Sequence, residues 1–172
     1  MKFAVSSAVL LAVAVALVRG DIATVKSDVS AIDAAVTDLN NQLKSDDINY
    51  FSALGIHSSA MNLDGKIQTA TTDTNAVTDA ISDADAQSII DTLTGTEKNV
   101  KSATDRLVVL KPKFDSLGVT GLAKGDVDSL ATDTHAFGQA LVSKAPADKK
   151  DAATALAAQF DADLANAKKT YD

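Results

Sequence analysis

DIATVKSDVSAIDAAVTDLNNQL, residues 21–43, carries the clearest structural signal in the chain. Its larger apolar residues recur in alternating steps of three and four, at Ile22, Val25, Val29, Ile32, Val36, Leu39 and Leu43. This spacing places all seven on one face of an α-helix of roughly 25 residues, while charged residues such as Lys26 and Asp33 lie off that face. The segment therefore predicts an amphipathic helix that packs against other helices.

Four further segments show a helical pattern that is less regular. Glycines at positions 55 and 65 interrupt the segment from Tyr50 to Ile81, which we expect to be helical, with the clearer pattern after about Asn62. Three more helices are expected to begin near Ser82, after Gly121 and near Ala145. The apolar positions of the last three are Ala86, Ile90, Leu93, Val100, Ala103, Leu107, Leu110 and Phe114; Leu122, Val127, Leu130, Phe137 and Leu141; and Ala152, Leu156, Phe160, Leu164, Ala167 and Tyr171. Because no window keeps the period-two alternation of a strand, the sequence predicts an all-α, up-and-down bundle of about five amphipathic helices.

One of the two prolines, Pro112, falls inside the third of these helices. A proline there removes a backbone donor and leaves the carbonyl of Val108 in need of another partner. The apolar face resumes beyond it at Phe114, and Gly118 is suited to close the helix. We therefore expect Pro112 to bend the helix near the end of the bundle rather than to end it.

The first twenty residues differ sharply in composition from the rest of the chain. Residues 1–20, MKFAVSSAVLLAVAVALVRG, combine a lysine, a short apolar run and small residues, which is typical of a secretory signal peptide cleaved after Gly20. Residues 21–172 are then expected to form a single domain. Without Lys2 and Arg19 the formal net charge changes from −7 to −9, which argues against nucleic-acid binding. The chain has no cysteine, which removes thiol nucleophiles and most structural zinc sites.

Two stretches near the C-terminal half resemble a known family. LKPKFDSLGV contains K-P-x-F-D at Lys111–Asp115, and LVSKAPADKKDAATALAAQFDADLANAKKTY contains A-P-A-D at Ala145–Asp148. With these motifs, and with the character of residues 21–43, the chain resembles the hydrophobic surface binding protein A family of secreted fungal proteins, also called cell wall galactomannoproteins. The resemblance implies a secreted, all-helical domain that adsorbs to hydrophobic surfaces, and some members bind long-chain fatty acids inside the bundle.

Residue types that carry catalysis or metal binding are few. His57 and His135 are the only histidines, and neither stands in a hydrolase or metal-binding motif. Asp83 and Asp85 fit the start of a helix, where acidic residues interact favourably with the helix dipole. We therefore expect no catalytic residue, no metal site and no cofactor.

The resemblance implies a lipid site in the bundle interior, and the candidate residues are the large apolar positions together with three threonines at inward spacing. They are Phe51, Leu54, Met61, Ile67, Thr74, Thr104, Leu107, Phe114, Thr134, Phe137 and Phe160. The threonine hydroxyls are candidates to hold a fatty-acid carboxyl group. The alternative is that each hydroxyl bonds back to a carbonyl of its own helix one turn earlier.

Three functional hypotheses follow. The first is a secreted, non-enzymatic protein that binds long-chain fatty acids, other lipids or hydrophobic surfaces through the apolar interior of the bundle. The second is a coat that adsorbs to a hydrophobic surface by opening the bundle and that recruits a hydrolase. The third is a structural or antigenic cell wall mannoprotein without a small ligand. All three place the protein outside the cell, with association with the cell wall as an option, and none requires a membrane-spanning segment.

Overall fold

A computed structural model of the chain describes residues 21–45 and 47–172. The predicted signal peptide, residues 1–20, lies outside the described residues. The described part forms five α-helices: α1 (Ile22–Leu43), α2 (Tyr50–Ala76), α3 (Asp83–Leu117), α4 (Thr120–Lys144) and α5 (Lys150–Tyr171). The predicted all-α fold and the number of helices are confirmed. No helix in this part of the chain is long and apolar enough to cross a lipid bilayer.

Polar side chains fix the starts of the first three helices. The Asp21 carboxylate accepts a hydrogen bond from the backbone of Ala23, and Asn49 and Ser52 form a reciprocal capping box at the start of α2. Ser82 caps α3 by accepting from the Asp85 amide at 3.1 Å, which agrees with the predicted start near Ser82. Each cap satisfies an amide that has no partner within its helix.

The second helix covers most of the segment that was predicted to be helical. It runs without a break through positions 55 and 65, where a side chain would meet no atom within 4 Å. The predicted helix is therefore confirmed from Tyr50 onward, although it ends at Ala76 rather than at Ile81. Each glycine weakens an isolated helix by only about 1 kcal/mol relative to alanine, and burial of the inward face outweighs that cost.

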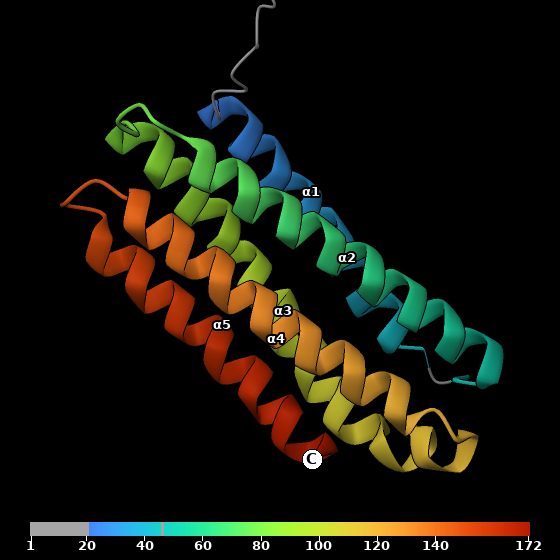
Figure 1. The fold of residues 1–172 in the computed structure, drawn as a ribbon. Coiled ribbons are helices and arrows are strands. Elements are labelled where there is room, and N and C mark those ends of the chain that lie inside the picture. The colour runs from blue at the N-terminus through green and yellow to red at the C-terminus, as the bar shows by residue number, and fades with distance from the viewer. Residues whose placement is uncertain (1–20, 46) are drawn as a thin grey trace, which may run out of the picture.

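The helices run alternately in opposite directions along the bundle (Figure 1). Around its axis their order is α1, α2, α4, α5, α3, and α3 packs back against α1. Successive helices are therefore not always neighbours, because α3 packs mainly on α1 and α5 and only weakly on α4. The loop of residues 77–82 carries the chain across one end of the bundle, and the five inward faces enclose a common interior (Figure 1).

A row of polar side chains joins the parallel helices α1 and α3. Lys26 pairs with Asp85 at 3.0 Å, the Thr96 hydroxyl donates to Asp33 at 2.7 Å, and Asn40 donates to Asn99 at 3.3 Å. The two residues of each contact are separated by a nearly constant number of positions in the sequence, so the contacts follow one register along the two helices. Hydrogen bonds between buried polar groups are directional, and this row therefore fixes how α1 and α3 align.

Pro112 lies inside α3, which continues to Leu117 and ends at Gly118 in the left-handed conformation, with φ of 71°. The expectation that the helix continues past the proline and closes at this glycine is confirmed. Near the proline, the buried Tyr171 of α5 donates its hydroxyl to the carbonyl of Leu107 at 2.9 Å. Burial raises the pKa of this phenol, so it stays protonated and remains a donor.

Tyr171→Phe should lower the stability of the bundle by about 1 kcal/mol, the usual net contribution of such a hydrogen bond. In a protein of this size the melting temperature then falls by about 2–4 °C. Thermal unfolding followed by circular dichroism measures the change. Tyr50→Phe is the matched control, since Tyr50 is exposed and should show almost no effect. Equal losses in both variants would contradict the role given to the Tyr171 hydroxyl.

Candidate functional site

An apolar cavity of about 100 Å³ lies in the bundle interior. All five helices contribute to its wall. The loops of residues 77–82 and 145–149, which lie at one end of the bundle, contribute Ile81 and Ala145. Its lining residues are Ile32, Val36, Leu63, Ile67, Ile81, Ala86, Ile89, Ile90, Leu93, Thr96, Val100, Leu130, Thr134, Phe137, Gly138, Leu141, Ala145, Ala153, Leu156, Ala157, Phe160 and Leu164. We call this space the main cavity.

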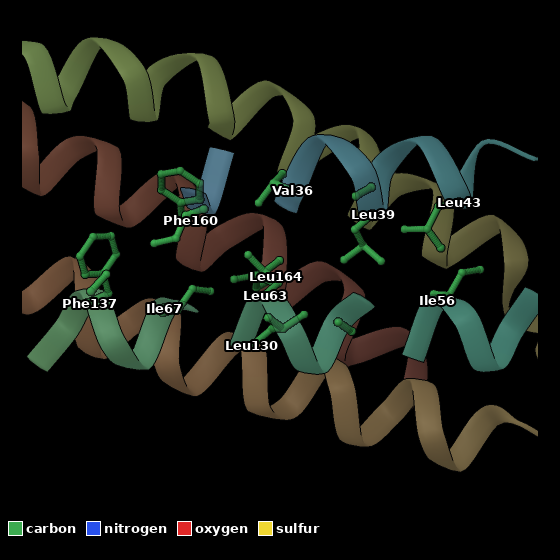
Figure 2. Close-up of a cluster of buried hydrophobic side chains, with 14 of the residues drawn as sticks. Val36, Leu39, Leu43, Ile56, Leu63, Ile67, Leu130, Phe137, Phe160 and Leu164 are labelled. Atoms are coloured by element: carbon green, nitrogen blue, oxygen red, sulfur yellow. The ribbon is translucent and has the colours of Figure 1, made fainter. Parts of the chain in front are cut away.

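Aliphatic and aromatic side chains make up almost the whole wall. Phe137 of α4 and Phe160 of α5 are both buried, and Figure 2 shows them pointing into the interior with Val36, Leu63 and Ile67 from the opposite helices. Among the described lining residues, only Thr96 and Thr134 carry a hydroxyl group, and Thr96 is already bonded to Asp33. Such a wall suits a hydrocarbon chain and offers little to a polar ligand.

Small residues bring α4 and α5 close together beside the cavity. A Cβ atom placed on Gly138 would stand 3.1 Å from the Cβ of Ala157, closer than ordinary carbon contacts. This close approach narrows the main cavity on one side. A ligand larger than the cavity must therefore displace these helices or the loops at the bundle end.

The structure brings together six of the predicted lipid-site residues in two groups. Ile67, Thr134, Phe137 and Phe160 line the main cavity. Leu107 and Phe114 line a second space of about 30 Å³ toward the opposite end of the bundle. Leu54 is half-buried and borders neither space.

Two predicted residues, Phe51 and Met61, do not lie in the interior. Phe51 is 82% exposed and Met61 is 61% exposed, so their assignment to the lipid cavity was wrong. The inward face of α2 passes instead through smaller side chains, including Ala53, Ala60 and Ala70. The sequence interpretation followed residue size, whereas the helical register turns both of these large side chains outward.

The three threonines differ in their surroundings. Thr104 is buried outside both cavities and donates to the carbonyl of Lys101 at 3.0 Å, as in the alternative interpretation. Thr134 lines the main cavity. Thr74 is fully buried, borders neither cavity and has no hydrogen-bond partner for its hydroxyl among the described residues.

Most of the main cavity wall, 18 of its 22 residues, was absent from the predicted set, notably the positions on α3 and most of those on α5. Leu93, Leu156 and Leu164 belong to the periodic apolar positions of these helices, so the sequence did indicate that they face inward. Periodicity does not distinguish a side chain that fills the core from one that borders a cavity. Ala157 and Gly138 gave no signal, because small residues are common on any helix face.

The second space contains a polar pair. The Nδ1 atom of His57 lies 2.8 Å and 3.0 Å from the two carboxylate oxygens of Asp126. Burial raises the pKa of Asp126, although His57 acts in the opposite direction. At about 30 Å³ the space suits one or two water molecules rather than an acyl chain.

Residues 21–45 and 47–172 contain no group of three or more histidine, aspartate or glutamate side chains placed to hold a metal ion. His135 bonds to Asp161 at 2.9 Å and to Gln139 at 2.9 Å on the exposed side of α4. Both histidines therefore join helices in pairs with a single carboxylate. Neither borders the main cavity.

Two carboxyl groups meet between α2 and α4. Gln68 donates to both Asp64 and Asp133, at 3.1 Å and 2.7 Å, and so holds the two carboxyl groups near one another. Burial, followed by the interaction with Asp133 and the charge of Asp126, raises the pKa of Asp64 to about 6. A raised carboxyl pKa means that the folded protein binds this proton more tightly than the unfolded chain.

Asp64→Asn should therefore stabilise the bundle at pH 8. The stability that Asp64 provides is fully present below its unfolded pKa of about 4 and is lost as the pH rises through about 6. Allowing for solvent screening, we expect a gain of about 1 kcal/mol, or about 2–4 °C in melting temperature, at pH 8. The gain should shrink toward pH 4.

Melting curves of the wild type and Asp64→Asn between pH 4 and pH 8 measure this difference. Asp38→Asn removes one exposed carboxylate from α1 and controls for the change in net charge. A gain of the same size in both variants, or one that does not depend on pH, would contradict the assignment to Asp64.

The described fold has counterparts among solved structures. A crystal structure of AfMp4p in complex with palmitic acid is 30% identical in sequence, with a TM-score of 0.83 over 88% of this chain and 100% of that chain. Ligand binding domain 1 of the Penicillium marneffei MP1 protein, complexed with arachidonic acids, is 17% identical, with a TM-score of 0.79 over 88% of this chain and 99% of that one. Domain 2 of the same protein, complexed with multiple arachidonic acids, is 14% identical, with a TM-score of 0.79 over 90% and 97% of the two chains. The two MP1 domains share the fold at this level of identity.

A comparison with curated protein sequences finds no match. The family model of hydrophobic surface binding protein A, however, matches residues 22–143, which comprise α1, α2, α3 and nearly all of α4. The match includes the first helix and the K-P-x-F-D motif, and it stops just before the A-P-A-D motif. The chain belongs to the hydrophobic surface binding protein A family.

Proposed function

We propose that this protein is a non-enzymatic binder of long-chain fatty acids and that the acyl chain enters the main cavity between α3, α4 and α5. The observation that carries the proposal is the almost wholly apolar wall of that cavity. It agrees with the palmitic acid held by AfMp4p, which has the same fold and 30% identity to this chain. Burial of hydrocarbon supplies about 0.8 kcal/mol per methylene, so a sixteen-carbon chain has a large gross driving force even after ordering costs.

The size of the cavity sets a condition on binding. An enclosed space of roughly 150 Å³ holds one benzene molecule, and the main cavity is smaller, at about 100 Å³. A sixteen-carbon chain therefore requires α4 and α5, or the loops at the bundle end, to move outward. Binding should accordingly be slower than diffusion, and it should show a negative heat-capacity change from burial of apolar surface.

Displacement of a fluorescent fatty acid from delipidated protein tests the proposal. Palmitate should displace the probe saturably at micromolar concentration with one dominant site, and calorimetry should give the negative heat-capacity change. Absence of saturable binding at micromolar palmitate would overturn the proposal for an internal site. Native mass spectrometry of the protein purified from its secretion medium should also show a co-purifying fatty acid.

Adsorption to hydrophobic surfaces is a second candidate function, and a separate observation favours it. Tyr50 and Phe51 form an edge-to-face pair at 5.9 Å at the start of α2, and Phe51 is 82% exposed. Exposed aromatic pairs of this kind add apolar contact area to an external surface. Phe51→Ser should reduce adsorption to polystyrene beads while leaving palmitate binding unchanged, and unchanged adsorption would count against this role.

We further propose that the protein is secreted, on the basis of the signal-peptide pattern in residues 1–20. The family is also called the cell wall galactomannoproteins, and this name supports a proposed association with the cell wall. Fractionation of culture medium and detergent-extracted cell wall tests both points. Retention of the whole protein in the cytosol would refute secretion.

A further inference from the structure

We propose that Lys144 binds the carboxylate of the fatty acid, at the end of the bundle where the loops of residues 77–82 and 145–149 meet. This inference rests on the proposed function, and it assigns the polar end of the ligand. The described residues give the wall of the main cavity no cationic group, although a fatty acid carries an anionic head group. The head group must therefore lie at one end of the cavity.

The position of Lys144 follows from the register of α4. Leu130, Thr134, Phe137 and Leu141 all line the main cavity, in alternating steps of four and three. Lys144 is the next position in this series, and the adjacent Ala145 also lines the cavity. The side chain of Lys144 therefore continues the cavity-facing row of α4 at the point where the helix ends.

The contacts of Lys144 leave its charge available. Its ammonium donates to the carbonyl of Val77 at 2.6 Å, and its side chain is half-buried. Within the described residues no carboxylate lies within ion-pair distance of it, whereas Lys26, Lys101, Lys111, Lys124, Lys149 and Lys168 each pair with an aspartate. An ammonium has three donors, and the carbonyl of Val77 uses one. Two donors therefore remain for a carboxylate.

A second polar group lies nearby on α2. Leu63 and Ile67 line the main cavity, and Thr74 and Val77 continue their row toward the same end of the bundle. The Thr74 hydroxyl is fully buried and has no hydrogen-bond partner in the described part of the chain, and it lies one helical turn before the carbonyl that holds Lys144. A buried hydroxyl without a partner is unfavourable. Although Thr74 borders neither cavity, a bound water, or a ligand oxygen that enters as the helices move outward, would satisfy its hydroxyl.

The proposed arrangement gives the ligand a direction. The carboxylate lies beneath the two loops, and the acyl chain extends past Phe137 and Phe160 toward the middle of the bundle. A charge-assisted hydrogen bond in a partly dehydrated site is stronger than a neutral one. Lys144 should therefore favour fatty acids over neutral lipids of the same chain length.

The test compares palmitate with 1-hexadecanol at pH 8, where the palmitate carboxyl group is ionised. Lys144→Met should weaken palmitate binding at least tenfold and change hexadecanol binding by less than twofold. Lys144→Gln, which keeps a donor but not the charge, serves if the methionine variant does not fold and should show the same selectivity. Lys150→Met, at an exposed position near the same end, should bind both lipids like the wild type.

The other possible results would overturn either the role of Lys144 or the proposed function. If the wild type binds palmitate and Lys144→Met binds it with an affinity within twofold of the wild type, the role of Lys144 is overturned. The proposed function is not affected by that result. An equal loss for palmitate and hexadecanol also overturns the role of Lys144, because Lys144 then acts only by holding the loop through Val77. Failure of the wild type to bind either lipid overturns the proposed function, and this inference with it.

Discussion

Ala86→Phe should abolish high-affinity palmitate binding, with a loss of at least tenfold, which corresponds to about 1.4 kcal/mol or more. Ala86 is 6% exposed, lies in the first turns of α3 and borders the main cavity. A phenyl ring at this position occupies space comparable to that of benzene, and the cavity of about 100 Å³ has no room for both ring and acyl chain. Overpacking costs about 1–3 kcal/mol, so the bundle should remain folded.

Displacement of a fluorescent fatty acid gives the affinity, and circular dichroism shows that the helices persist. Ala136→Phe is the matched control, since it adds the same ring to the exposed face of α4. This control should bind palmitate like the wild type. Unchanged affinity in a folded Ala86→Phe protein would mean that the ligand occupies another part of the molecule.

Phe137→Ala should have the largest effect on stability of the changes considered. Phe137 is 5% exposed and forms part of the cavity wall on α4. Loss of a buried phenyl group typically lowers the free energy of unfolding by about 3–5 kcal/mol, since it removes apolar burial and leaves a larger void. For a chain of this length the melting temperature should fall by about 10 °C or more.

The larger void should also change the response to lipid. An acyl chain can fill it with less outward movement of α4 and α5, so palmitate should raise the melting temperature of Phe137→Ala more than that of the wild type. Phe51→Ala is the control, because this exposed phenylalanine should contribute less than about 0.5 kcal/mol. An equal or smaller rise in Phe137→Ala would contradict the placement of the acyl chain beside Phe137.

The predicted bundle was confirmed because amphipathic periodicity is a local property of the chain. The row from Val25 to Leu43 is buried as its spacing indicated, and Gly118 closes α3 at the expected place. The start of the last helix was placed too early. The segment at Pro146 forms a turn, with the Lys149 amide bonded to the Pro146 carbonyl at 3.0 Å, and α5 begins only at Lys150.

The candidate site was predicted less completely. Phe137 and Phe160 were assigned to the interior and line the main cavity, whereas Phe51 and Met61 face solvent. Ala86 and Lys144 gain their significance from their neighbours in space, and neither residue type indicates a lipid site by itself. A lysine at the end of a helix is usually a solvated residue that interacts with the helix dipole.

The amino-acid sequence by itself determined the helices, their apolar faces and the family, because these follow from the spacing of residues along one chain. The tertiary structure alone decided the order of the helices around the bundle, with α3 between α1 and α5, and therefore which faces enclose the main cavity. A cavity is the space that several faces together fail to fill. Its position depends on how side chains from all five helices meet, and no single segment of sequence contains that information.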